Sequence, residues 1–299
     1  MFVSARARIF FRWDRAKRVP VRGVANAIVL MTAATPTEKT ATGRGCGRMD
    51  GESLFLVVRS IGGLSTCIVG VALALRMLRL ARRTRQLPEL TIGLHMVALV
   101  LGYLIEFAGM EIGSRHPSAG IWLRGTANLL YAVSIFVYLL FTWKVFAPAS
   151  RWAPTLVAAT TLALVVGWTG EVLTTDFGFS AARFAEPWFW IAFVPRMIGM
   201  GWASFEALSH HSRLRRRIAL GLADPVAANR LLLWALAALF EWMIYLAVAI
   251  TILAGCPDGF LTGDAALWVS AFGVAGASCM WFGFFPPQRY QRWVEDRAV

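Results

Sequence analysis

The chain has 299 residues, of which 58% are hydrophobic and 16% are charged, whereas an average soluble domain is about half apolar and about a quarter charged. Because it also contains several apolar runs of about twenty residues, the length that crosses a bilayer, the composition excludes a soluble enzyme, a disordered chain and a disulfide-stapled secreted module. The formal net charge of +13 would suggest nucleic acid as the partner of a soluble protein, but in a membrane protein basic residues mark cytoplasmic loops, so we expect no nucleic-acid partner.

Seven apolar windows predict transmembrane helices. In chain order they cover residues 54–75, 90–112, 119–143, 153–173, 187–208, 231–254 and 265–285. We therefore expect an all-α polytopic integral membrane protein, a bundle of seven transmembrane helices. Asp224 followed by Pro225 predicts the start of the sixth helix, because Asp is a favoured N-cap and proline suits the first helical position.

The distribution of Lys and Arg between the loops predicts the orientation. Fifteen of them lie in the loops after the first, third and fifth predicted helices and in the C-terminal tail, whereas the opposite loops hold only Arg115 and Arg183. Because cytoplasmic loops carry an excess of Lys and Arg, we expect the N-terminus outside and the C-terminus inside. The expected location is the plasma membrane or the bacterial inner membrane.

The first 48 residues conflict with this orientation, because they carry ten Lys and Arg and two acidic residues. Two explanations remove the conflict: residues 1–34 resemble a cleavable signal sequence, or translation begins at Met49. We favour Met49, since Asp50 and Glu52 then form a short acidic N-terminus. We expect residues 1–48 to be a disordered basic leader, residues 49–286 to form the transmembrane domain, and residues 287–299 to be a short cytoplasmic tail.

Six ionisable residues fall in the outer half of the predicted helices, where a charge costs about 2.5–3.5 kcal/mol on insertion scales and needs a partner. They are Arg59, Glu106, Arg124, Glu171, Arg196 and Glu241. Two interpretations remain open: internal ion pairs that fix helix register, or an outward-facing polar cavity that binds a ligand. We expect Arg196 and Glu241 to pair near the middle of the membrane, with Pro195 kinking the helix beside them.

Metal chemistry has weak support in the sequence. Glu206 and His210 lie four residues apart, on one face of a helix, and His95 could be a third ligand. The chain has only four histidines, so we do not expect a metal centre. No Walker loop, GxSxG, HExxH or nucleotide signature is present, and we expect no cofactor and assign no catalytic residue.

The segment 212–234 is rich in arginine and is predicted to lie on the cytoplasmic side. Its basic residues are Arg213, Arg215, Arg216, Arg217 and Arg230. We expect the first four to contact anionic lipid headgroups. Since no extramembrane segment after residue 49 is long enough to be an output domain, a separate cytoplasmic protein is a further expected partner.

Three sequence strings resemble those of a family of bacterial multi-pass membrane proteins without an assigned activity. They are RRTRQLPELTIGL (82–94), LRRRIALGLADPVAANRLLLW (214–234) and FFPPQRYQRW (284–293). The resemblance implies a helical membrane protein and carries over no catalytic residue. The predicted arrangement of seven helices is also similar in outline to that of seven-helix receptors, which is a likeness of topology alone.

We expect a receptor-like or sensor-like protein that binds a small ligand through the six intramembrane ionisable residues, because such residues are functional candidates by default. The alternative is a small-solute or proton-coupled transporter that uses Glu241 or Glu106 as its protonatable group. A membrane-embedded metal-dependent hydrolase built on His95, Glu206 and His210, and a structural assembly subunit, are the remaining alternatives.

Overall fold

The computed structural model describes residues 52–175, 177, 180–255 and 264–296, which form helices and contain no strand. The predicted leader, residues 1–48, lies outside these residues. The helices are α3 (Glu52–Thr84), α4 (Leu87–Gly113), α5 (Pro117–Phe146), α6 (Ala153–Thr174), α7 (Ala181–Ala185), α8 (Pro187–Ile218), α9 (Pro225–Leu253), α11 (Asp264–Phe284) and α12 (Gln288–Asp296).

Each of the seven predicted segments lies within or closely overlaps one long helix, so the predicted all-helical architecture is confirmed. Six of the described helices, all the long ones except α8, are long and apolar enough to cross a membrane. This number is consistent with a multi-pass membrane protein. The 32-residue helix α8 is longer than the bilayer requires, but Arg196 and Glu206 interrupt its apolar part and its last turns carry the arginine cluster.

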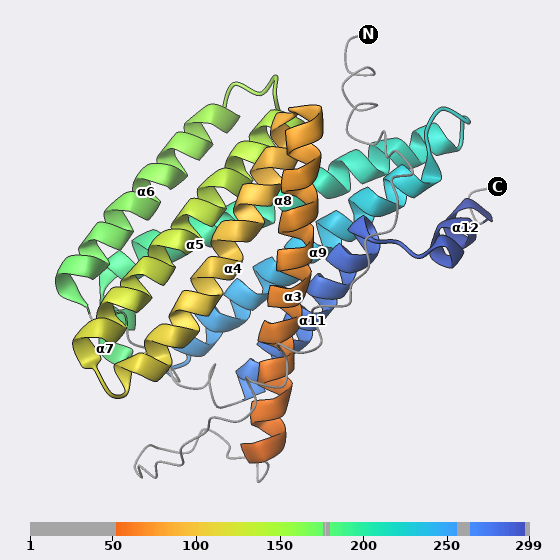
Figure 1. The fold of residues 1–299 in the computed structure, drawn as a ribbon. Helices are drawn as coiled ribbons and strands as arrows, with labels where there is room; N and C mark the ends of the chain where they lie inside the picture. Colours follow the sequence, from red (N-terminus) through yellow and green to blue (C-terminus); the bar gives the residue numbers. More distant parts are fainter. Residues whose placement is uncertain (1–51, 176, 178–179, 256–263, 297–299) are drawn as a thin grey trace. The chain divides into compact units, whose positions relative to one another are not determined.

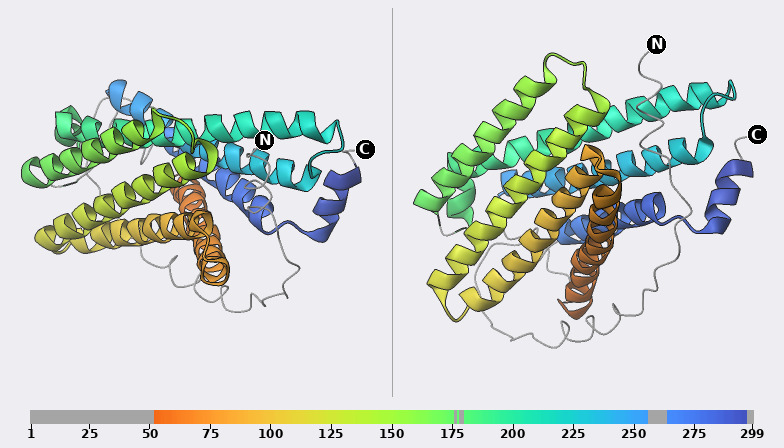
Figure 2. Two further views of the ribbon diagram at one scale, coloured as in Figure 1. Left: turned by 90° about the horizontal axis from the view of Figure 1, so that it is seen from above. Right: turned by 45° about the horizontal axis from the view of Figure 1, so that its top comes forward.

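The long helices pack in a closed circuit (Figures 1 and 2). Each of α3, α4, α5 and α6 packs against the next, α6 packs against α8, and α8, α9 and α11 continue the order until α11 returns to α3. Helix α5 also packs against α8. The polar residues on the inward faces of α4, α5, α8 and α9 are therefore brought close together.

The helix starts follow simple local chemistry. Five of the long helices have proline in their first turn: α4, α5, α6, α8 and α9. Proline suits this position because the first amide groups of a helix have no intrahelical acceptor. The predicted N-cap of α9 is confirmed: the Asp224 side chain accepts a hydrogen bond of 2.8 Å from the Val226 amide.

Small residues allow two of the helix pairs to approach closely. A Cβ on Gly167 of α6 would lie 2.5 Å from the backbone nitrogen of Ala192 in α8. A Cβ on Gly62 of α3 would lie 2.9 Å from the Cα of Ser270 in α11. Membrane helices gain much of their association energy from such close packing, because lipid supplies no hydrophobic drive between them.

Two short helices lie at the ends of the long ones. Helix α7 connects α6 to α8 and begins with Ser180, whose hydroxyl accepts a hydrogen bond from the Arg183 amide. Helix α12 falls within the predicted C-terminal tail and packs against α9. The Asn229 side chain of α9 donates a 2.8 Å hydrogen bond to the Tyr290 hydroxyl of α12, so this part of the tail is attached to the bundle.

Candidate functional site

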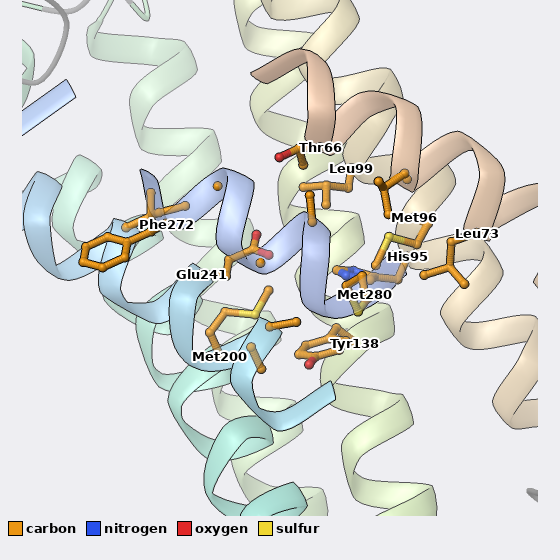
Figure 3. A pocket seen from close by; sticks show the side chains of 18 of the residues that line it. Thr66, Leu73, His95, Met96, Leu99, Tyr138, Met200, Glu241, Phe272 and Met280 are labelled. Atoms are coloured by element: carbon orange, nitrogen blue, oxygen red, sulfur yellow. The ribbon is translucent and has the colours of Figure 1, made fainter. Parts of the chain in front are cut away.

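A cavity of about 70 Å³ lies inside the bundle, between α3, α4, α9 and α11, with single residues from α5 and α8. It has room for several water molecules, each of which needs roughly 10–15 Å³. Figure 3 shows the cavity with side chains from all these helices around it. The polar residues that line it are Thr66, His95, Tyr103, Tyr138, Trp234 and Glu241.

Glu241 supplies the only carboxylate among the described residues that line this cavity. Its side chain lies with those of Thr66, Met200 and Phe272 around the space in Figure 3. No hydrogen bond or ion pair joins Glu241 to another described residue. A carboxylate at membrane depth that lacks a partner is costly, and this cost favours either a proton or a cationic ligand at this position.

The rest of the cavity wall is aromatic, aliphatic and sulfur-containing. The aromatic members are Tyr103, Tyr138, Trp234 and Phe272, and the methionines are Met96, Met200 and Met280. Aromatic faces carry partial negative charge and attract cations, and methionine sulfur is soft and adaptable. The wall is thus compatible with an apolar ligand that carries a positive charge, and its described residues offer no cationic side chain to an anion.

His95 is fixed in place at one side of the cavity by Ser134. Its Nδ1 lies 2.8 Å from the Ser134 hydroxyl oxygen and 3.0 Å from the Ser134 carbonyl oxygen. The same hydroxyl donates a 3.2 Å bond to the His95 carbonyl. The imidazole also stacks on Tyr138, with ring centroids 4.6 Å apart. This environment holds the ring in one orientation and leaves Nε2 as the nitrogen that can serve another partner.

Glu106 lies close to the cavity but does not line it. Its Oε2 accepts a 2.5 Å hydrogen bond from the Tyr131 hydroxyl of α5. The Tyr131 ring in turn meets the edge of Tyr103, with centroids 5.4 Å apart. Because Tyr103 also lines the cavity, Glu106 is connected through two tyrosines to the space beside Glu241.

Arg196 does not form the expected ion pair with Glu241 in the structure. Its guanidinium instead donates bonds of 3.4 and 3.5 Å to the Asn128 side-chain oxygen of α5. Arg196 is buried, and its Nε has no hydrogen-bond acceptor among the described residues. Tyr245 of α9, one helical turn from Glu241, lies within electrostatic reach of both charges. The rotations of the two helices explain why the ion pair does not form: α8 turns Arg196 towards α5, and α9 turns Glu241 towards the cavity.

Glu171 forms an ion pair that sequence reasoning did not anticipate. Its Oε1 lies 2.8 Å from Nε of Arg183, with side-chain exposures of 1% and 6%. Arg183 also donates to the Phe177 carbonyl and lies over the Phe177 and Phe189 rings. In the sequence, Arg183 was assigned to a loop. The feature that could have predicted its burial is Ser180, an N-cap residue that begins a short helix and turns Arg183 inward.

The remaining two ionisable candidates lie elsewhere. Arg124 of α5 packs over the glycine face of α4, because a Cβ on Gly109 would lie 3.1 Å from its Cγ. The side chain of Arg59 lies outside the described residues. Of the six predicted ligand-binding or ion-pair residues, Glu241 therefore lines the cavity, Glu106 and Arg196 are near it, and Arg124 and Glu171 lie in other helix contacts.

The three metal-ligand candidates each have other interactions. His95 is held by Ser134, His210 Nδ1 lies 3.0 Å from the Glu206 carbonyl oxygen, and Glu206 accepts a 3.2 Å bond from Trp202 Nε1. In the part of the chain that the structure describes, no three His, Cys, Asp or Glu side chains converge as metal ligands.

The arginine cluster extends the C-terminal end of α8. Arg213, Arg215, Arg216 and Arg217 are all exposed there. Their side chains are thus free of the bundle core, as headgroup contact requires.

Comparison with known protein families, with curated proteins and with solved structures finds no match to this chain.

Proposed function

We propose that this chain is a receptor-like membrane protein that binds a small apolar cation, such as a protonated amine, in the cavity beside Glu241. The observation that carries the proposal is the Glu241 carboxylate, which lines an aromatic cavity without a hydrogen bond or ion pair to another described residue. Intramembrane ionisable residues are functional candidates by default. Among them, Glu241 has the strongest claim, because it occupies a costly position without a hydrogen bond or ion pair to another described residue.

The charge of the ligand follows from the composition of the wall. A cation would gain from the Glu241 carboxylate and from the faces of Tyr103, Tyr138 and Trp234. A carboxylate or phosphate ligand would meet Glu241 and no cationic side chain among the lining residues that the structure describes. The hydrocarbon part of an amine would replace water against Phe272 and the other apolar members, which adds a favourable hydrophobic contribution.

The proposed setting is a cell membrane, with α8 as a seventh crossing and the N-terminus of α3 outside. Support for the seventh crossing comes from the packing of α8 between α6 and α9 in the circuit of long helices. Support for the orientation comes from the Lys and Arg in the loops on one side. In this arrangement the arginines at the end of α8 contact anionic headgroups, and a separate cytoplasmic protein carries any output.

The test uses butylammonium as the probe and the full chain in lipid nanodiscs. A ligand that binds only the folded state stabilises it by about 2.7 kcal/mol at a hundred times its Kd. We expect butylammonium to raise the unfolding temperature of the wild type, whereas butanol and butyrate, its neutral and anionic counterparts, leave it unchanged. The Glu241→Gln variant should lose the response to butylammonium.

Glu111→Gln is the matched control, because Glu111 lies on α4 with an exposed side chain and pairs with Arg115. This variant should respond to butylammonium as the wild type does. The proposal fails if butyrate stabilises the wild type and butylammonium does not, or if Glu241→Gln retains the full response.

Proton-coupled transport is the second candidate function, since a single carboxylate in an apolar cavity can also carry a proton with its solute. A pH gradient across proteoliposomes would then drive butylammonium flux in the wild type and not in Glu241→Gln. Binding without flux would favour the receptor-like protein.

A further inference from the structure

We propose that Glu241 exchanges protons with the end of the bundle where α4 terminates, through a relay formed by Tyr103, Tyr131 and Glu106. This inference goes beyond ligand binding: it shares the cavity with the proposed function, but it concerns how a proton reaches Glu241. It rests on the hydrogen bond, the ring contact and the cavity that join these residues in series.

The relay begins at Glu106, which is only partly buried. Seven residues separate it from the end of α4 at Gly113, which is about 10 Å along a helix. Its Oε2 and the Tyr131 hydroxyl are joined by a hydrogen bond of 2.5 Å. A short bond between a carboxylate and a hydroxyl is among the strong hydrogen bonds of proteins and is suited to proton transfer.

The second part of the relay joins Tyr131 to the cavity. The rings of Tyr131 and Tyr103 are in edge contact, with centroids 5.4 Å apart. Tyr103 lines the same cavity as Glu241 and interacts electrostatically with both Glu241 and Glu106. The cavity volume of about 70 Å³ leaves room for water between the Tyr103 hydroxyl and the Glu241 carboxylate.

The transfer balances without a charged tyrosine. The Glu106 carboxylate first takes a proton from a hydronium ion that reaches it from the end of α4, and water is left. Glu106 passes this proton to the Tyr131 oxygen while Tyr131, after rotation of its hydroxyl, releases its own proton to a bridging water molecule, which passes a proton on to the Tyr103 hydroxyl. The same exchange at Tyr103 delivers a proton to Glu241. Glu106 is left ionised and Glu241 neutral, and each tyrosine has gained one proton and lost one.

Other groups also face Glu241, and all can influence its charge. Helix α4 contributes His95 and Tyr103, α5 contributes Tyr138, and α9 contributes Tyr245, which also lies within electrostatic reach of Arg196 of α8. Cys67 of α3 interacts electrostatically with Tyr103. The α11 residues that line the cavity are Phe272, Gly273, Gly276, Ala277 and Met280, and none of them titrates. Among these groups, Tyr103 contacts Tyr131, which is hydrogen-bonded to a second carboxylate, Glu106.

Time-resolved infrared spectroscopy after a pH jump tests the relay in nanodiscs. The carbonyl band of protonated Glu241 is identified by its loss in Glu241→Gln. Positioned proton donors accelerate transfer by roughly 10²–10⁴-fold, so Tyr131→Phe and Glu106→Gln should each slow the rise of this band by about a hundredfold. Both substitutions are close to isosteric, and unchanged unfolding temperatures will show that the variants are folded.

The matched controls are Glu111→Gln, on the same helix as Glu106, and Tyr290→Phe, on α12; neither should change the rate. The relay is refuted if Tyr131→Phe and Glu106→Gln both protonate Glu241 at the wild-type rate, or if Glu241→Gln removes no carbonyl band. Butylammonium binding is measured on the same samples. Loss of the relay with retained binding, or the reverse, therefore separates this inference from the proposed function.

Discussion

Breaking the Glu171–Arg183 pair should cost far more stability than its single salt bridge suggests. The perturbation is Arg183→Met, which keeps the length of the side chain and leaves the Glu171 carboxylate with 1% exposure and no cation. Removing one partner of a buried pair costs about 3–5 kcal/mol, because the other charge stays buried without compensation. The hydrogen bond that Arg183 donates to the Phe177 carbonyl is lost as well. We therefore expect the free energy of unfolding to fall by about 3–5 kcal/mol and not by less.

The assay is reversible unfolding in mixed micelles, with helix content as the readout. The double variant Glu171→Gln/Arg183→Met should recover most of the loss, because a neutral pair needs no counter-charge. The exposed pair of Glu111 and Arg115, with 46% and 76% of the side chains accessible, provides the control: Arg115→Met should cost about 0–1 kcal/mol. If Arg183→Met costs no more than Arg115→Met, or the double variant is as unstable as the single one, the burial argument is wrong.

Three further changes test other contacts by the same unfolding measurement. Asp224→Ala should lower the free energy of unfolding by about 1 kcal/mol through loss of the α9 cap, whereas Asp224→Asn should restore it; equal stability of the two would contradict the capping role. Asn128→Leu should cost about 1.5–3 kcal/mol, since it removes the acceptor of a buried charged donor, Arg196; an unchanged midpoint would show that water replaces the amide. Gly167→Ala should cost about 1–3 kcal/mol by forcing α6 away from α8, while Gly63→Ala, with nothing within 4 Å of the new Cβ, should be neutral or stabilising; a similar effect of both would exclude close packing as the cause.

The prediction of the helices from the sequence succeeded because helix formation in lipid is decided locally. A run of apolar residues of bilayer length must satisfy its own backbone hydrogen bonds, and the helix is the structure that does so within one segment. The position at which α9 starts is also decided by neighbouring residues, since Asp224 caps the amide of Val226, two residues further along the chain.

The partners of the charged residues could not be predicted in the same way. The long helices are apolar around most of their circumference, so periodicity does not reveal which face turns inward. Arg196 was expected to pair with Glu241, yet it donates to Asn128, an uncharged residue that a search for ionisable groups leaves out. Arg183 was placed in a loop, yet helix α7 carries it into the interior beside Glu171.

The sequence alone therefore determined that the chain is helical and where the apolar part of each long helix lies, and six of these helices have the length and polarity of membrane spans. Only the tertiary structure decided that Glu241 lies beside a cavity without a hydrogen bond or ion pair to another described residue, and that Tyr131 links Glu106 to the neighbourhood of this cavity. The physical reason is that these contacts depend on the rotation and spacing of helices, which are set by packing between segments far apart in the sequence, and 135 residues separate Glu106 from Glu241.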